Sequence, residues 1–476
     1  MPLKKNDLVT LHITGTTHEG LGVGRSDGYV LFVPFTAEGD LAQVRVVKAL
    51  THYGYGRLER LLSPSPDRIE VACPVFGLCG GCTYWHISYE AECRIKEQQV
   101  RTALQKELGE EPQLLPIVPA PSQTRYRNKV QLPVGLSGGS AVTGFYRGRS
   151  HQIIPCSGCL LQPEAADRAA RLLCDHIDRF HLSVYDERLH RGLVRSLFVR
   201  VGAATGQVMV VIVVNGQFLP HADELIAALR SELPGLVSVQ LCINQKQTNV
   251  VLGDRYLTLW GTDRLEDRLL GNRYRISAAS FYQVNHDQCE ALYLEAARLA
   301  ALTGRERVLD LYCGIGTIGL SMAAQCRELV GVEVVPSAVQ DAAICAREAG
   351  FENVRFLCAD AAQAAAQLAA EGFSPDVVIL DPPRKGCDAS LLETVAGMDP
   401  DRIVYISCNC ATLARDARLL RDLGYSLREA RPFDLFPRTS HCETAALFYR
   451  IRKRAAYKKP ISKNTFETRE RIERKK

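Results

Sequence analysis

Residues Arg307 to Leu320 read RVLDLYCGIGTIGL, and this stretch decides the fold of the C-terminal half of the chain. An apolar strand leads into Gly314 and Gly316, and a third glycine completes the spacing G-x-G-x-x-G. Glu333 closes the next apolar stretch, LVGVEVV. Such glycines let the backbone approach a ligand closely, and a carboxylate at the second strand tip suits ribose hydroxyls. The pattern predicts a nucleotide-binding site and leaves NAD open as its ligand.

Strands and helices alternate from about residue 270 to residue 452, which is typical of a doubly wound parallel sheet. Two further strands of this region end in the loops DPPRKG, from Asp381, and SCNC, from Ser407. Ligands of such sheets bind at the carboxyl ends of the strands. A cysteine at this edge has no obvious task in hydride transfer, but methylation of an unreactive ring carbon needs a nucleophile. Cys408 and Cys410 are therefore either packing residues or include a nucleophile.

The remaining chain divides into three regions, so the protein is predicted to be a multidomain α/β protein. Residues 1–62 alternate apolar and polar positions between glycine turns, which predicts a small closed β-barrel. Residues 63–269 mix helical and strand patterns and are expected to form a central α+β domain. The net charge of +5 comes from the end of the chain, because residues 452–476 hold eleven Lys/Arg against three Glu. We expect residues 453–476 to be a solvated basic tail or to lie along a polyanion such as RNA.

The cysteines point to metal ligands rather than disulfides. The longest apolar strand run, VMVVIVV at residues 208–214, is far too short to span a membrane, and the N-terminus lacks an apolar signal core. We therefore expect a cytoplasmic protein without membrane contact. Thiols stay reduced in that compartment, so seventeen cysteines cannot be interpreted as a disulfide framework.

Three of these cysteines form a compact motif. Cys73, Cys79 and Cys82 have the spacing C-x₅-C-x₂-C with a Gly-Gly turn inside it. A fourth ligand is needed, and the segment HQIIPCSGCLLQ offers Cys156 and Cys159. Four thiolates suit either zinc or an iron–sulfur cluster, and the spacing does not decide between them.

Together these motifs resemble a known family. The stretches DLYCGIGTIGL, DPPRKG, SCNCATLARD and FPRTSHCETAALF resemble the RNA (uracil-5-)-methyltransferases that use S-adenosylmethionine. The resemblance extends through FYQVN, the cysteine motif CPVFGLCGGC and a TRAM-like, OB-like barrel at the N-terminus, so it covers nearly all of the chain except the tail. A TRAM barrel combined with a cysteine cluster is similar to the branch of the family that acts on 23S ribosomal RNA.

The resemblance implies a covalent mechanism. Uracil carbon 5 is too weak a nucleophile to take a methyl group from a sulfonium, but adding a thiolate at carbon 6 makes it an enolate. The family pattern gives this role to Cys408, and Cys410, where most members carry proline, is then expected to be a packing thiol. The base that removes the carbon-5 proton matches Glu443. The alternative for Glu443 is an exposed carboxylate at a strand end.

The resemblance also implies the binding residues. The S-adenosylmethionine site is expected to comprise Gln283, Tyr312, Gly314, Gly316, Glu333, Asp360 and Asp381 in a Rossmann-like domain. Asp381 could also hydrogen-bond the uracil N–H, which requires the nucleotide to leave its stack. The family pattern selects Cys159 over Cys156 and favours a [4Fe–4S] cluster on Cys73, Cys79, Cys82 and Cys159.

Ribosomal RNA is thus the expected partner of a monomeric protein. The segments TRYRNK, at residues 124–129, and GFYRGRSH, at residues 144–151, interleave basic and aromatic residues as RNA contacts do, although solvated strand faces look the same. Three alternatives remain. Transfer RNA could be the substrate. An NAD-dependent oxidoreductase would leave Cys408 and Glu443 without a role, and a non-catalytic RNA-binding iron–sulfur protein would leave the DPPRKG loop without one.

Overall fold

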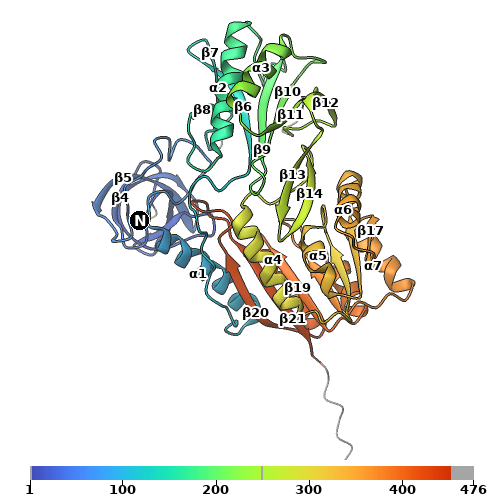
Figure 1. The fold of residues 1–476 in the computed structure, drawn as a ribbon. Helices are drawn as coiled ribbons and strands as arrows, with labels where there is room; N and C mark the ends of the chain where they lie inside the picture. The colour runs from blue at the N-terminus through green and yellow to red at the C-terminus, as the bar shows by residue number, and fades with distance from the viewer. Residues whose placement is uncertain (1–2, 149, 248–249, 452–476) are drawn as a thin grey trace, which may run out of the picture.

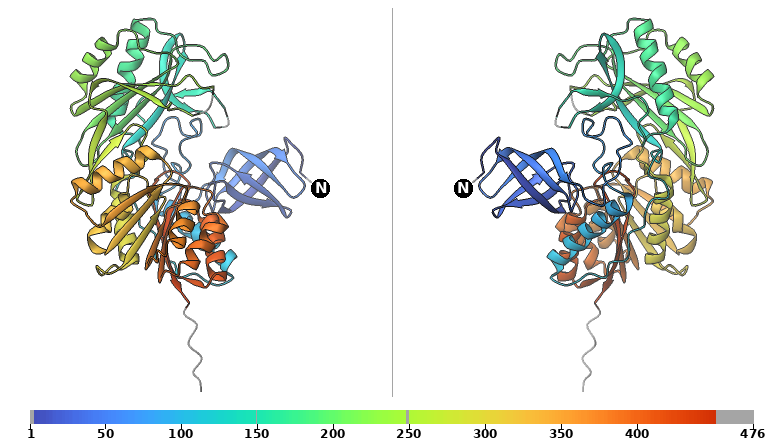
Figure 2. Two further views of the ribbon diagram at one scale, coloured as in Figure 1. Left: turned by 90° about the vertical axis from the view of Figure 1, so that its right-hand side faces the viewer. Right: turned by 90° about the vertical axis from the view of Figure 1, so that its left-hand side faces the viewer.

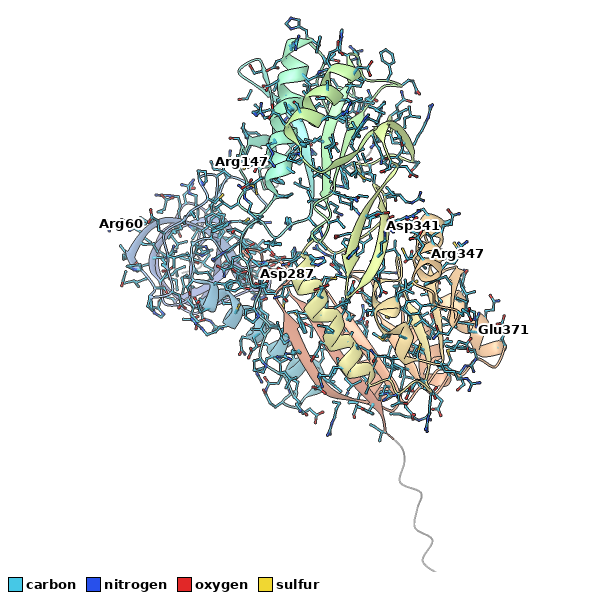
Figure 3. The ribbon with its side chains drawn as sticks, in the orientation of Figure 1. Arg60, Arg147, Asp287, Asp341, Arg347 and Glu371 are labelled. Carbon is cyan, nitrogen blue, oxygen red and sulfur yellow. The ribbon has the colours of Figure 1, made fainter. Side chains whose placement is uncertain are left out.

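The computed structural model describes residues 3–148, 150–247 and 250–451 as three connected parts (Figure 1). An N-terminal barrel, a central sheet and a C-terminal sheet meet near the beginning of helix α4, where Asp287 lies (Figure 3). The predicted tail from residue 453 lies outside the described residues. Within the described ranges, no helix combines the length and the hydropathy that a bilayer crossing requires.

A closed five-stranded barrel forms the N-terminal part, as predicted, with the strand order β1-β2-β3-β5-β4. Alternate side chains point inward, and Leu11, Leu31 and Val44 are fully buried in its small core. The barrel stands to one side of the other two parts (Figure 2). Its strands are β1 (Leu8–Thr16), β2 (Gly22–Ser26), β3 (Tyr29–Val33), β4 (Leu41–Ala49) and β5 (Tyr53–Ser63).

The central part is a seven-stranded mixed sheet with the order β12-β11-β10-β9-β6-β7-β8. Helices α2 (Glu164–Arg179) and α3 (Ala222–Glu232) contribute to the core on one face. A two-stranded hairpin follows the sheet and leads to the C-terminal part. The strands are β6 (Lys129–Ser137), β7 (Ser140–Tyr146), β8 (Ile153–Pro155), β9 (Val194–Val201), β10 (Val208–Val214), β11 (Leu236–Ile243) and β12 (Arg255–Gly261), and the hairpin is β13 (Arg264–Leu269) and β14 (Asn272–Ser277).

Strand β10 joins the central part to the C-terminal part. Its alternate residues Val210 and Ile212 belong to the core under α2 and α3, whereas Met209 and Val211 belong to the core shared with the C-terminal sheet. All seven residues of this strand are buried. Burial on both faces explains why this sequence is a continuous apolar run rather than an alternating one.

The C-terminal sheet has seven strands in the order β17-β16-β15-β18-β19-β21-β20. The first five are parallel, which confirms the predicted doubly wound sheet, and β21 runs antiparallel to both of its neighbours. No helix lies between β20 and β21, and strands joined without a crossover pair antiparallel. The strands are β15 (Arg307–Leu311), β16 (Glu328–Glu333), β17 (Val354–Cys358), β18 (Val377–Leu380), β19 (Arg402–Ser407), β20 (Tyr425–Phe433) and β21 (Glu443–Arg450).

Helices cover both faces of this sheet (Figure 1). One of them, α1 (Tyr89–Leu108), lies within the range predicted for the central domain but packs against α9 and β20 instead. Its residues Val100, Leu104 and Leu108 are buried in the core of the C-terminal sheet. The other helices are α4 (His286–Ala300), α5 (Thr317–Met322), the 3₁₀ turn η1 (Ala323–Gln325), α6 (Pro336–Glu348), α7 (Ala361–Ala370), α8 (Ala389–Gly397) and α9 (Cys410–Asp422).

Candidate active site

Three predicted side chains meet at one edge of the C-terminal sheet. Asp381 follows the parallel strand β18, and Cys408 follows its neighbour β19. Strand β21 is antiparallel to β19, with Ser407 opposite Thr444, so Glu443 begins β21 at the edge where β19 ends. The edge formed by carboxyl ends of parallel strands is where ligands bind in such folds. The sheet register therefore gathers a thiol and two carboxylates at a binding edge.

The electrostatics of these groups depend on burial. Burial raises the pKa of Asp381 to about 7. Burial, with a smaller contribution from Asp381, raises the pKa of Glu443 to about 8, while Arg384 opposes the shift. The pKa of the Cys408 thiol rises to about 11, first through burial and then through Glu443 and Asp381. Glu443 is 4% exposed, so it is a buried carboxylate and not the exposed strand-end group of the alternative interpretation.

A pocket of about 270 Å³ opens beside Cys408. Its wall combines the loop between β1 and β2 of the barrel, helix α1 and the loops at the sheet edge. The barrel thus helps to enclose the space beside Cys408. The lining residues are His18, Glu19, Lys96, Gln99, Val100, Arg384, Cys408, Asn409, Cys410, Ser440, His441 and Cys442.

The two thiols of SCNC have different surroundings. Asn409 is the N-cap of α9 and accepts a hydrogen bond from the Ala411 amide at 3.0 Å, so Cys408 lies in the loop and Cys410 in the first turn of the helix. Cys410 also packs against the hydrophobic core. Burial is the largest cause that raises the pKa of the Cys410 thiol, whereas carboxylates add to the shift at Cys408. The thiol among the charged groups is Cys408.

The glycine loop lies at the same sheet edge. Gly314 and Gly316 have φ of 57° and 79°, a backbone conformation that favours glycine. Glu333 accepts hydrogen bonds from the amides of Gly314, at 3.1 Å, and Val335, at 2.8 Å. Its carboxylate therefore fixes the glycine loop to the tip of β16. No side-chain or backbone atom approaches within 4 Å of a Cβ built on Gly314, so the loop faces open space.

Exposed apolar surface lies beside the glycine loop. Val334 and Val335 are 61% and 47% exposed although they follow a buried strand, so apolar surface lies beside the Glu333 carboxylate. Asp360 caps α7 by accepting from the amides of residues 362 and 363, and burial, with a smaller contribution from the Asp360 charge, raises the pKa of Tyr312. An apolar patch with a carboxylate beside it suits an adenine ring and ribose hydroxyls.

Gln283 belongs to the FYQVN segment that precedes α4. It is 8% exposed, and its carbonyl accepts from the Asn128 side-chain amide at 2.8 Å. The Asn128 amide N–H also donates to the Val284 carbonyl. These bonds tie FYQVN to the start of β6. Gln283 thus lies at the junction of the central and C-terminal parts, and its role toward a cofactor stays a prediction.

Five thiols line one cavity of about 260 Å³ in the loops before β6 and after β8: Cys73, Cys79, Cys82, Cys156 and Cys159. The Gly81 amide donates to Cys79 Sγ at 3.3 Å inside the predicted turn. Burial raises the pKa of Cys82 to about 12, whereas a hydrogen bond with Cys156 lowers the pKa of Cys159 to about 6. Among the described residues, however, no three His, Cys, Asp or Glu side chains are close enough to hold a metal ion. The cavity therefore gathers the five thiols without bringing three of them together around one ion.

The basic segments have unequal roles. In TRYRNK, Arg125 Nη1 donates to the carbonyls of Cys159 and Gln162 and pairs with Asp167 at 2.7 Å, so its guanidinium holds the loop of Cys159. Arg147, in GFYRGRSH, is exposed on the central domain (Figure 3). Both arginines are exposed, but the charge of Arg125 is paired with Asp167, so Arg147 is the stronger candidate for an RNA phosphate contact.

The comparisons with known proteins agree with this geometry. Residues 164–451 match the family described as tRNA (uracil-5-)-methyltransferase, and residues 2–58 match the TRAM domain. An RNA methyltransferase from Halalkalibacterium halodurans is 44% identical over 448 residues, which cover 94% of this chain and 98% of the relative. An RNA methyltransferase from Clostridium tetani is 40% identical over 447 residues, covering 94% and 97%.

Among solved structures, the Pyrococcus abyssi tRNA (uracil-54, C5)-methyltransferase in complex with S-adenosyl-L-homocysteine superposes with a TM-score of 0.75 at 26% identity, over 92% of this chain and 99% of that one. The fold and the site define a class I RNA methyltransferase that depends on S-adenosylmethionine. The chain belongs to the RNA (uracil-5-)-methyltransferase family, and NAD-dependent hydride transfer is not supported.

Sequence reasoning gave no role to several residues of the site. Arg384 and His441 lie within quoted motifs and contact each other at 3.2 Å, but their loops are far apart in sequence. Val334 looks like an ordinary strand residue, and only its exposure marks it. Motif composition could have flagged Arg384, because a lone cation beside two carboxylates and a thiol has an electrostatic effect at any such edge.

Proposed function

We propose that the protein methylates carbon 5 of a uridine in 23S ribosomal RNA through a covalent adduct on Cys408. The observation that carries this proposal is the placement of a thiol between two carboxylates, one of them buried, at the binding edge of a methyltransferase sheet. A thiol has no task in methyl transfer to an oxygen or nitrogen nucleophile, but carbon 5 of uracil must first be activated.

The steps follow from the groups present. Cys408 first gives up its thiol proton to solvent; its Sγ then bonds to carbon 6 of the uracil, and the electron pair of the 5,6 double bond moves toward the carbon-4 carbonyl. Bound S-adenosylmethionine would supply an electrophilic methyl group to carbon 5, with its sulfur–methyl bond breaking so that S-adenosylhomocysteine leaves. Glu443 then removes the proton from carbon 5, the double bond re-forms and the sulfur–carbon bond breaks. Because burial keeps the pKa of Glu443 near neutrality, its carboxylate can both accept this proton and return it to water.

Arg384 and Asp381 complete the assignment. Arg384 opposes the rise that burial causes in the pKa of both Cys408 and Glu443, so its positive charge favours a thiolate and a carboxylate at the same edge. Asp381 is half-buried directly after β18 and can accept the uracil N3–H. Hydrogen bonding from a fixed carboxylate distinguishes uracil from cytosine, whose N3 is an acceptor.

Two RNA classes are candidates for the substrate. The combination of a TRAM barrel with a cysteine motif supports ribosomal RNA, through the resemblance described above. Transfer RNA is supported by the likeness to the Pyrococcus abyssi enzyme, whose own substrate is tRNA uridine 54. Mapping 5-methyluridine in 23S ribosomal RNA and in transfer RNA, from cells with and without the gene, tests both. Loss of the nucleotide from transfer RNA alone would contradict the ribosomal assignment.

We also propose that the five-thiol cavity holds a [4Fe–4S] cluster on Cys73, Cys79, Cys82 and Cys159. The donor set supports it, because four thiolates are the usual ligands of such a cluster. The cluster would supply a fixed cross-link, since methyl transfer moves no electron. Anaerobically purified protein should be brown, and Cys159→Ser should remove the colour whereas Cys156→Ser should not. A colourless protein with one zinc per chain would retain the site but contradict the iron–sulfur assignment.

A further inference from the structure

A fully buried lysine of helix α1 holds the loop that leads to Glu443. Lys96 is 0% exposed, and its Nζ donates to Glu92 Oε1 at 2.6 Å and to Asp434 Oδ1 at 2.7 Å. A third bond, at 3.2 Å, goes to the carbonyl of Phe436. All three donors of the ammonium group therefore have acceptors, and two of these acceptors lie at the beginning of the loop between β20 and β21.

The two carboxylates around Lys96 tie α1 to the same loop. Asp434 accepts a second bond, from the Tyr89 hydroxyl at 2.8 Å, and Glu92 Oε1 also accepts from the backbone amide of Arg438 at 2.7 Å. The first two turns of α1 thus contact the loop at Asp434, at Arg438 and at the residue midway between them. Arg438 has φ of 69°, a backbone conformation that a non-glycine residue adopts only where its surroundings enforce it.

Hydrogen bonds inside the loop extend this anchoring to the candidate active site. The Phe436 carbonyl accepts from the amide and from the hydroxyl of Thr439, at 3.1 Å and 2.8 Å. The Thr439 hydroxyl oxygen in turn accepts from the His441 amide at 3.3 Å, and His441 Nε2 accepts from Arg384 at 3.2 Å. The chain of bonds that begins at α1 therefore ends at the cation of the site and two residues before Glu443.

Burial makes this ion cluster costly as a source of stability. The side chains of Lys96, Glu92 and Asp434 are all 0% exposed, and charges removed from water recover the cost of desolvation only when their geometry is close to ideal. Apolar residues of similar volume often stabilise such a site equally well. Charged groups add a fixed arrangement, because each one requires its partners in defined directions. The cluster therefore fits a positioning role better than a purely stabilising one.

Resting on the function proposed above, we propose that Lys96 is a positioning residue that places the general base Glu443 against the bound uracil. Glu443 is the first residue of β21, so the loop before it determines how its side chain enters the site. Lys96 acts through that loop and needs no contact with the reacting atoms. Misplacing a catalytic group by about 1 Å can cost about 10²-fold in rate, even when the altered residue lies away from the chemistry.

The double variant Lys96→Met/Asp434→Asn tests the proposal without leaving a buried charge unpaired. It removes one positive and one negative charge, and it leaves Glu92 beside the Arg438 guanidinium, 3.7 Å away. Its urea midpoint should therefore stay close to that of wild type. The kcat should fall about ten-fold or more, and KM for RNA should stay within about two-fold. A protein–RNA adduct carrying the methyl group should accumulate, because removal of the carbon-5 proton is slowed.

Two further variants distinguish placement from a general weakening of α1. Arg101→Met also removes ion pairs of this helix, but with Glu97 and Glu111, which lie outside the loop, so it should keep the wild-type kcat. Lys96→Arg keeps the charge in a different shape and should retain more activity than Lys96→Met. An unchanged kcat in the double variant would overturn the proposal. A lower kcat without any adduct, or an equal loss in Arg101→Met, would overturn it as well.

Hydrogen exchange on the full-length protein provides a readout that needs neither RNA nor methyl transfer. Amides of residues 435–443 should exchange about ten-fold faster or more in the double variant, because local opening sets the rate. Amides of β17, at the opposite edge of the sheet from β20, should exchange as in wild type. Absence of turnover and adduct in wild type would reject the methylation chemistry but leave this exchange difference standing. Equal exchange at residues 435–443 in both proteins would reject the positioning role alone, so the two failures are distinguishable.

Discussion

Asp381 follows β18 and Glu443 begins β21 at the same edge of the C-terminal sheet, and the charge of Asp381 adds to burial in raising the pKa of Glu443. Burial is the larger cause at Glu443 and the cause at Asp381. Two carboxylates held close together in a buried site cannot both ionise easily. At neutral pH, repulsion between the two carboxyl groups therefore destabilises the folded protein. A site with only a structural role would avoid this cost.

This pair predicts a pH dependence of stability. The pKa of Glu443 is raised from 4.5 to about 8, so the folded state holds this proton more tightly than the unfolded chain does. The resulting stability is fully present below about pH 4.5 and is lost as the pH rises through about 8. Glu443→Gln stays neutral, so its urea midpoint should fall less than that of wild type between about pH 5 and pH 9.

The matched control for this measurement is Glu371→Gln, because Glu371 is exposed at the end of α7 (Figure 3). That variant should follow the wild-type curve. If the urea midpoint of Glu443→Gln falls with pH as steeply as that of wild type, Glu443 is ionised at little cost in the folded protein. Glu443 would then not be suited to act as a base near neutral pH.

Glu333 should determine the affinity for S-adenosylmethionine. Glu333→Gln removes the charge beside the exposed valines and weakens one of the bonds to the Gly314 and Val335 amides. We expect affinity to fall about ten-fold or more, measured by calorimetry, because a charged hydrogen-bond acceptor is worth about 1.5–3 kcal/mol. Glu328→Gln, at the other end of β16, should bind normally, since Glu328 pairs with Arg307 and Arg355 away from the ligand edge. Heat on titration with NAD would contradict the assignment.

Arg147 and Arg125 should respond differently to alanine substitution. Arg147→Ala removes an exposed charge, so RNA affinity should fall and the slope of log affinity against log salt should shrink by about 1. Arg125→Ala should leave that slope unchanged and reduce the bound metal, because Arg125 holds the loop of Cys159. Fluorescence anisotropy at several KCl concentrations measures the first effect, and metal analysis the second. The assignment of Arg125 fails if its variant loses salt dependence as Arg147→Ala does.

The sequence predicted the loops at the sheet edge better than it predicted the helix packing that encloses the site. The glycine loop and the loops after β18 and β19 are local, since each follows directly from a strand that periodicity identifies. Helical patterns were predicted within residues 63–269, but not the packing of helix α1 on α9. The buried side of α1 includes Glu92 and Lys96, which pattern reasoning assigns to solvent. Only the contact with Asp434 makes their burial possible.

Arg438 illustrates a second limit. Its motif was quoted as part of a resemblance, but its contacts with Thr83, Trp85 and Glu92 join residues more than three hundred positions apart. No periodicity or spacing predicts such pairs. The cysteines show the opposite case, because their spacing predicted that they gather and they do line one cavity. The spacing did not predict that their sulfur atoms lie too far apart to coordinate one ion.

The order of covalent steps distinguishes Cys408 from Cys410 and tests Glu443 at once. Glu443→Gln should still attack and methylate the RNA but should release it slowly, because removing a general base costs about 10²–10⁴ in rate. An adduct carrying the labelled methyl group should therefore accumulate and survive denaturing electrophoresis. It forms only if the neighbouring thiol, raised to a pKa of about 11 by burial, loses its proton once RNA is bound.

Double variants assign the thiol. Adding Cys408→Ala to Glu443→Gln should abolish the adduct, whereas adding Cys410→Ala should leave it, because Cys410 packs in the first turn of α9 and not among the carboxylates. RNA substituted with 5-fluorouridine should trap wild type at the same stage, since fluorine does not leave as a proton does. If the adduct persists in Cys408→Ala and disappears in Cys410→Ala, the nucleophile is Cys410 in helix α9 and not Cys408. The edge formed by β18, β19 and β21 would then bind the base without attacking it.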